Sequence, residues 1–318
     1  MGTYLNPGSK GFQESLNSDI YVDKTGLIEK TNAKINTLQK YLCISRPRRF
    51  GKSMAANMLA AYYDRETDSR HLFKHFQVSR ITSYEEHRNQ YDVIRVNIQE
   101  FLSVSHEIDE MLKLLQERLI LELKRKYPEY VTQNNLMFAM QDVYAFTQHP
   151  FIILIDEWEC LFREYQHDQN AQKKYLDFLR AWLKDKDYVA LAYMTGILPI
   201  AKYSSGSELN MFMEYTMASE SKFGNVFGFS DKEVDMLYER YCENNAGKEE
   251  TLNVTREGLS EWYDGYFTKN GERMYNPRSV VAALENNNLG SYWTSSGPYD
   301  EIFYYVENNI ADVRKDIA

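Results

Sequence analysis

Phosphate binding is the first chemistry that the residue pattern predicts. Segment 45–54 reads SRPRRFGKSM, and its Gly51-Lys52-Ser53 is the second half of the phosphate-binding pattern G-x-x-x-x-G-K-[ST]. In this pattern the glycine lets backbone N–H groups approach phosphate oxygens, the lysine supplies a movable positive charge, and the hydroxyl can ligate Mg²⁺. Arg46 stands where the pattern has its first glycine, so the match is incomplete.

A second group of residues supplies the acids that phosphoryl transfer needs. The run 150–157, PFIILIDE, is a continuous apolar stretch that ends in Asp156 and Glu157. Such runs are typical of strands buried on both faces of a parallel sheet, and ligands bind at the carboxyl edge of that sheet. We expect Asp156 to hold Mg²⁺ and Glu157 to orient and deprotonate the attacking water.

Thr195 is the third candidate, because it directly follows a further strand candidate at 188–194. If this strand lies between the phosphate-loop strand and the Asp-Glu strand, the Thr195 side chain would face the terminal phosphate. The alternative is an ordinary threonine at a strand end that satisfies hydrogen bonds of the turn.

Strands and helices alternate along the first two thirds of the chain. Apolar or alternating runs predict strands at 41–45, 91–98, 150–156 and 188–194, with a last short one at 223–229. Helical spacing predicts helices at 52–63, 106–127, 136–146 and 171–184, and a helical excursion within 64–90. The alternation predicts an α/β fold, a P-loop NTPase core with a parallel sheet flanked by helices.

The signals for strands end before residue 230, and signals for helices and turns follow. Ser230-Asp231-Lys232-Glu233 reads as a capping box that opens a helix, and Asn276-Pro277 begins another helix well. From residue 230 onward we expect helices and turns only. The sequence therefore predicts two domains, a P-loop domain at 1–229 and a mostly helical lid domain at 230–318 that is incomplete at its C-terminus.

Composition, net charge and cysteine content limit the kinds of molecule that this chain could bind and the compartment in which it works. With 43% hydrophobic and 26% charged residues, the 318-residue chain has the composition of a soluble globular protein. Its net charge of −9 argues against nonspecific nucleic-acid binding. Three scattered cysteines without a C-x-x-C pair favour reduced thiols in the cytoplasm, and no apolar run approaches the roughly 18 residues that span a membrane.

Seven motifs in a fixed order give a more specific indication. They read YVDKT at 21–25, RPRRFGKS at 46–53, IDE at 155–157, TGI at 195–197, FGF at 227–229, WYDGY at 262–266 and YNPRSV at 275–280. Together they resemble the predicted AAA-ATPase-like family of bacterial proteins, over nearly the whole chain. The family's own phosphate loop reads RPRRFGKS, which implies that Arg46 is a feature of the group.

The resemblance implies a P-loop ATPase core followed by a helical lid, with ATP and Mg²⁺ as ligands. Many relatives read Asp-Glu-Tyr-Asp where this chain reads Asp156-Glu157-Trp158-Glu159, which keeps both acids of the pair. Family members often continue into a nuclease-like domain of the PD-(D/E)xK type. We find no such carboxylate-carboxylate-lysine set on strands here, so either the chain is truncated before that domain or the protein lacks it. A C-terminal nuclease-like domain and a separate protein partner are the candidate partners besides the nucleotide.

These observations define the expected site residues. We expect Lys52, Glu157 and Thr195 to be catalytic, and Ser53 and Asp156 to hold the metal. The expected nucleotide-binding residues are Arg46, Pro47, Arg48, Arg49, Phe50, Gly51, Lys52, Ser53 and Met54. The three arginines either contact phosphate or pair with acidic neighbours and hold the loop. Asp23 and Lys24 either border the adenine pocket or form an ion pair.

Three functions are consistent with this site. The first is Mg²⁺-dependent ATP hydrolysis that drives a conformational switch. The second is a nucleotide-binding regulatory module with negligible turnover, which the incomplete phosphate loop favours. The third is the ATPase part of a nucleic-acid-processing enzyme, which the net charge does not support.

Overall fold

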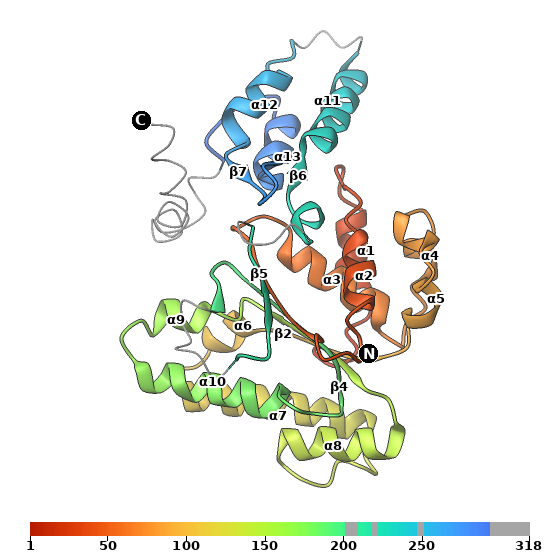
Figure 1. Ribbon diagram of the computed structural model, residues 1–318, viewed down its shortest axis with the longest axis vertical. Helices are drawn as coiled ribbons and strands as arrows, with labels where there is room; N and C mark the ends of the chain where they lie inside the picture. The colour runs from red at the N-terminus through yellow and green to blue at the C-terminus, as the bar shows by residue number, and fades with distance from the viewer. Residues whose placement is uncertain (201–208, 218–221, 247–250, 293–318) are drawn as a thin grey trace.

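A five-stranded parallel sheet forms the centre of the larger part of the protein (Figure 1). The computed structural model describes residues 1–200, 209–217, 222–246 and 251–292. The strands are β1 (Tyr41–Ser45), β2 (Asp92–Asn97), β3 (Phe151–Asp156), β4 (Val189–Gly196) and β5 (Met213–Tyr215). Their order is β2-β3-β4-β1-β5, and every neighbouring pair is parallel. The predicted α/β fold is confirmed.

Helices cover both faces of this sheet because side chains alternate along each strand. Ile44 belongs to one hydrophobic cluster and Cys43 to the other. The Ile44 face packs on α1 (Lys10–Leu16), α2 (Gly26–Asn32), α3 (Lys52–Tyr63), α4 (Arg70–Phe73), η1 (Gln77–Arg80) and α5 (Tyr84–His87). The Cys43 face packs on α6 (Ile98–Leu102), α7 (Ile108–Lys126), α8 (Leu136–Thr147), α9 (Cys160–Glu164) and α10 (Gln169–Leu183).

Strand order brings the expected site residues to one edge. β4 lies between β3 and β1, as the argument about Thr195 required. All three strands run in the same direction, so their carboxyl ends meet. This edge carries the phosphate loop after β1, the Asp-Glu pair at the end of β3, and Thr195 at the end of β4.

The prediction of a strand at 223–229 was wrong for most of its length. Residues 224–226 form a short 3-10 helix, η3 (Gly224–Val226), and only the end of the segment enters β6 (Phe229–Ser230), which belongs to a second sheet. The fifth strand of the parallel sheet is β5 instead. With three residues, β5 is too short to show a period in the sequence, and it forms because β1 offers a free edge.

The segment after β6 contains more than helices and turns, so that expectation was also wrong. A three-stranded antiparallel sheet in the order β6-β8-β7 includes β7 (Tyr266–Phe267) and β8 (Arg273–Tyr275). Around it lie α11 (Asp231–Asn245), α12 (Arg256–Tyr263) and α13 (Pro277–Glu285), with their own hydrophobic cluster. The predicted caps are present, the capping box at Ser230 and the Asn276 cap of α13.

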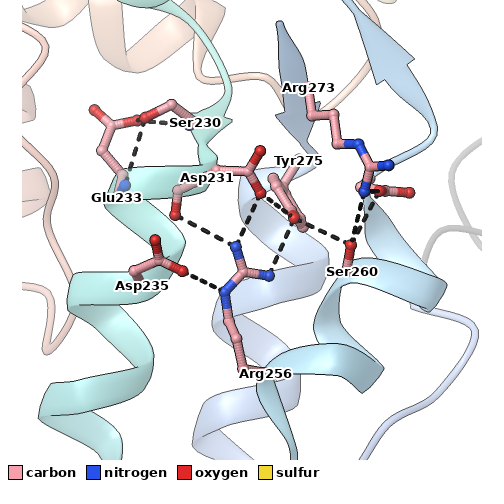
Figure 2. Close-up of polar contacts among 9 residues, drawn as sticks. Ser230, Asp231, Glu233, Asp235, Arg256, Ser260, Arg273 and Tyr275 are labelled. Carbon is pink, nitrogen blue, oxygen red and sulfur yellow. Dashed lines mark hydrogen bonds and ion pairs between the residues drawn. The ribbon is translucent and has the colours of Figure 1, made fainter.

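We call residues 230–292 the lid segment. Its helices are tied together by a polar network around Arg256 (Figure 2). The Arg256 guanidinium donates to Asp231 Oδ1 at 2.9 Å and Asp235 Oδ1 at 2.6 Å, both on α11. It also donates to the Tyr275 hydroxyl at 3.1 Å, and that hydroxyl donates to Asp231. Because Tyr275 directly precedes the cap of α13, this network fixes the start of α13 relative to α11. The two-domain boundary at 229/230 itself stays a prediction, and residues 293–318 lie outside the described residues.

Candidate functional site

The phosphate loop turns into α3 at Gly51. Gly51 caps the helix with φ +84°, a left-handed conformation that disfavours side chains, and a Cβ there would meet nothing within 4 Å. Backbone conformation therefore explains the glycine. Lys52 begins α3, and its ammonium donates to the carbonyl oxygens of Arg46 and Pro47, each at 2.8 Å. The Lys52 side chain thus reaches back across the phosphate loop to the residues at its start.

Arg46 is fully buried and holds backbone carbonyls. Its guanidinium donates to the oxygens of Ser45 at 2.8 Å, Tyr215 at 2.9 Å and Phe223 at 3.0 Å. It also lies over the Phe227 ring, 5.3 Å from the centroid. These three contacts are to carbonyl oxygens rather than to the acidic side chains that one of the two alternatives named. Arg46 joins β1 to the end of β5 and to the segment that leads into the lid.

The rest of the arginine-rich loop contacts the lid segment. Phe50 is buried against Met274 and Tyr266, with ring centroids 4.8 Å apart in the Phe50–Tyr266 pair. The Asn276 amide donates to the Arg48 carbonyl oxygen at 3.2 Å. Arg49 donates to the Tyr292 carbonyl oxygen at 2.7 Å. The phosphate loop is therefore held on one side by the sheet and on the other by the lid.

The acid pair lies at the end of β3. Asp156 is buried; its Oδ1 atom accepts from the Thr195 hydroxyl at 2.5 Å and from the Glu157 N–H at 3.1 Å. Its Oδ2 atom is buried without a hydrogen-bond partner among the described residues. Glu157 has φ +52°, a strained conformation for a non-glycine residue. Its side chain lines the pocket described below.

Thr195 is positioned to orient Asp156. The threonine is fully buried, and it does not belong to the pocket lining. Its hydroxyl donates a hydrogen bond to the Oδ1 atom of Asp156, and this bond fixes the direction of the Asp156 Oδ2 atom. The direct contact between Thr195 and a terminal phosphate stays a prediction.

Glu159 is a buried carboxyl beside this edge. Its Oε1 atom accepts from the Ile197 N–H at 3.0 Å, and its Oε2 atom lies so close to Gly196 that a Cβ there would come within 2.3 Å. Burial raises the pKa of the Glu159 carboxyl above its usual range, while the Ile197 N–H and the positive charge of Lys52 oppose the rise. The close approach explains why residue 196 is a glycine.

One pocket of about 900 Å³ brings these groups together. The phosphate-loop residues that line it are Arg48, Arg49, Phe50, Gly51, Lys52, Ser53 and Met54. Asp156 and Glu157 line it from the sheet edge, whereas Arg46 and Pro47 lie outside the lining. Its six cationic side chains, of lysine and arginine, outnumber its three acidic ones, in a chain whose net charge is −9. Such a lining favours a polyanionic ligand.

The pocket lining also has apolar residues, and part of the lining comes from the lid. The apolar lining residues include Phe12, Ile20, Tyr21, Val22, Val226, Phe227 and Val281. Lys24 also lines the pocket, and it donates to Glu233 of α11 at 2.6 Å. Lys24 therefore forms an ion pair with Glu233 and also lines the pocket, and the pair connects the N-terminal segment to the lid. Asp23 accepts from the Thr25 and Gln77 backbone N–H groups.

Sequence reasoning missed several polar residues of this pocket, including Gln99, Arg163 and Arg278. Gln99 follows β2, Arg163 lies on α9 after the acid pair, and Arg278 lies on α13 of the lid. Strand order could have placed Gln99, because β2 ends at the same edge as β3. The YNPRSV motif contained Arg278, although the motif alone gave no direction to its side chain. No sequence signal distinguished Arg163 from a surface arginine.

The residues at the sheet edge fit a magnesium ion. In the described residues, no group of three or more His, Cys, Asp or Glu side chains could hold a metal ion. Mg²⁺ does not need such a group, because it usually keeps several waters and takes one or two protein ligands plus phosphate oxygens. Asp156 and Ser53 both line the pocket, and the buried Asp156 Oδ2 atom without a hydrogen-bond partner matches this need.

The chain belongs to the predicted AAA-ATPase family, whose sequence model matches residues 8–205. An uncharacterized protein in the vnfD 5′ region of Azotobacter chroococcum mcd 1 is 24% identical over 292 residues. That alignment covers 87% of this chain and 50% of the relative, so the chain spans half the length of that protein.

Among solved structures, the Aeropyrum pernix ORC2 protein, in ADPNP-ADP complexes, aligns with a TM-score of 0.40 and 11% identity. The alignment covers 95% of this chain and 72% of that chain. Across the parts of the chain that are described, every helix is too short or too polar to cross a membrane.

Proposed function

We propose that this chain binds ATP with Mg²⁺ in the 900 Å³ pocket and hydrolyses it. The observation that carries the proposal is the convergence of the phosphate loop and the Asp-Glu pair on one cavity with a cationic lining. A triphosphate matches the cationic side chains of the lining in charge, and a purine base matches its apolar and aromatic side chains, such as Tyr21 and Phe227. Residues 1–229 form the nucleotide-binding domain in this proposal, and residues 230–318 form the lid.

Each residue of the site has a role in this proposal. Lys52 and the N–H groups of the loop bind the phosphates, once the ammonium leaves the two loop carbonyls that it now contacts. Ser53 and Asp156 hold Mg²⁺, with Thr195 orienting Asp156. Bound there, the ion would neutralise charge on the phosphates. Glu157 accepts the proton of the attacking water, and Arg278 contacts the nucleotide from the lid.

In this proposal the lid senses the nucleotide through its contacts with the phosphate loop. Phe50, the Arg48 carbonyl and Arg49 all contact the lid segment, so a phosphate that moves the loop also moves these contacts. The Arg256 network passes a movement of α13 to α11 (Figure 2). This supports a conformational switch driven by binding and hydrolysis.

The test compares the wild type with Lys52→Ala and Glu157→Gln. We expect Mg·ATP to raise the melting temperature of the wild type and of Glu157→Gln, and to leave Lys52→Ala unchanged. Phosphate release should be measurable only for the wild type. Turnover that neither substitution lowers would contradict these roles. A wild type that is stabilised by Mg·ATP and releases no phosphate over hours would identify a regulatory nucleotide-binding module instead.

A further inference from the structure

Arg163 is a cation of the pocket that the roles above leave unassigned. It lies on α9, shortly after the acid pair in sequence, and it lines the pocket together with Asp156 and Glu157. Lys52 and Ser53 line the same cavity from the phosphate loop. Arg163 therefore lines the same cavity as Glu157, the residue proposed to activate water.

The helix that carries Arg163 is fixed in place by its other side. Cys160, Leu161 and Phe162 are buried in the core. The Phe162 ring lies 5.6 Å from that of Trp158 and 6.2 Å from that of Tyr175. The Tyr175 hydroxyl donates to the Trp158 carbonyl oxygen at 2.8 Å. The backbone of an arginine on such a helix is held in place by packing. A residue that contacts a reacting group requires such a fixed backbone position.

A hydrogen bond anchors the outer end of α9 as well. The Gln99 side chain donates to Glu164 Oε1 at 3.1 Å, and this joins α6 to α9 at the rim of the pocket. The adjacent arginine is not part of that contact. Gln99 and Glu164 thus hold the helix end without using the Arg163 guanidinium.

No hydrogen bond or ion pair reaches the Arg163 guanidinium from the residues that the structure describes, and its Nε atom is buried. Arg46 differs sharply, because its guanidinium contacts three carbonyl oxygens. Burying part of a guanidinium without a hydrogen-bond acceptor is unfavourable even where a carboxyl such as Glu159 interacts with it by charge, and an anion in the pocket that accepts from it removes this cost. The position indicates a cation kept available for an anionic ligand.

We infer that Arg163 binds the terminal phosphate of the triphosphate and stabilises the charge that develops there during hydrolysis. The inference rests on the proposed function. In the reaction the water oxygen bonds to the terminal phosphorus while the bond from that phosphorus to the bridging oxygen breaks. One water proton passes to Glu157, and ADP and phosphate leave. Arg163 donates to the terminal phosphate oxygens, and acts within the same chain as the pocket.

The inference separates ATP from ADP, because ADP lacks the phosphate that Arg163 would contact. We expect Arg163→Gln to lower the affinity for Mg·ATP by about 10-fold or more, the effect of losing one charge-assisted hydrogen bond. The affinity for Mg·ADP should stay within about two-fold of the wild type. The kcat should fall by about 100-fold, as for other transition-state donors. Equilibrium binding of both nucleotides and phosphate release measure these effects.

Two further variants keep the result interpretable. Arg163→Lys keeps the positive charge and should lie between the wild type and Arg163→Gln in ATP affinity. Arg180→Ala removes an exposed arginine of α10 that does not line the pocket, and it should match the wild type throughout. Melting temperatures without nucleotide show whether each variant is folded.

The outcomes distinguish this inference from the proposed function. An Arg163→Gln protein with wild-type kcat and a wild-type ratio of ATP to ADP affinity would overturn the role of Arg163 and leave the proposed function standing. Equal losses of ATP and ADP affinity would also overturn it, because Arg163 would then act on a part that both nucleotides share. A wild type that binds neither nucleotide would overturn the proposed function and this inference together.

Discussion

Replacing Arg46 by glycine restores the first glycine of the phosphate-binding pattern, and the structure predicts that this damages the protein. Arg46 is fully buried, and its guanidinium donates to three carbonyl oxygens. Hydrogen bonds to charged groups contribute about 1.5–3 kcal/mol each, and their loss leaves buried carbonyls without these donors. The losses are not additive, so we expect Arg46→Gly to lower the free energy of unfolding by about 3–5 kcal/mol.

Arg49→Gly is the matched control for this experiment. Arg49 is exposed, and its φ of +66° suits glycine, so its replacement should change the free energy of unfolding by less than about 1 kcal/mol. Urea unfolding, followed by far-ultraviolet circular dichroism and tyrosine fluorescence, measures both variants. Equal urea midpoints for Arg46→Gly, Arg49→Gly and the wild type would refute the reasoning about the buried guanidinium.

Three other substitutions test the neighbouring features. Thr195→Val removes the hydrogen bond to Asp156, so the Mg²⁺ affinity of the nucleotide complex should fall by about 10- to 100-fold in a Mg²⁺ titration, whereas Thr195→Ser should retain it. Glu159 has a raised pKa in the folded state, so its contribution to stability is complete below the unfolded pKa and is lost as the pH rises through the folded pKa. Glu159→Gln should therefore gain stability relative to the wild type as the pH rises above the pKa of the unfolded-state carboxyl, and melting curves with no such trend would contradict the assignment. Arg256→Ala breaks the network of Figure 2 and should lower the stability of the lid by about 1–2 kcal/mol, seen as faster limited proteolysis there; unchanged cleavage would count against it.

Local sequence patterns were sufficient to predict most strands of the parallel sheet. β1, β2, β3 and β4 have continuous apolar or β-branched runs, and each was predicted to within two residues at either end. β5, β7 and β8 were missed because two or three residues show no period, and such strands form only where a neighbour offers an edge. The misplaced strand at 223–229 has the same cause, since its apolar residues serve a 3-10 turn and the packing beneath it.

The residues of the candidate site also fall into those that a sequence pattern predicts and those that only the tertiary structure reveals. Gly51, Lys52, Asp156 and Glu157 were recognisable because their chemistry depends on spacing over a few residues next to a strand or a helix start. Arg163 and Arg278 were not, because the direction in which an arginine points depends on the helix that carries it and on what that helix packs against.

The arginine-rich half of the phosphate loop shows the difference most clearly. The amino-acid pattern was enough to place this loop between a strand and a helix and to associate it with a phosphate ligand. The partners of Arg46, however, lie 169 and 177 residues further along the chain, and those of Phe50 lie in the lid. Contacts over such separations leave no periodic mark in a sequence, because they depend on how strands and helices far apart come together. The folded chain therefore shows Arg46 as a buried support of the loop and Arg163 as a cation of the pocket.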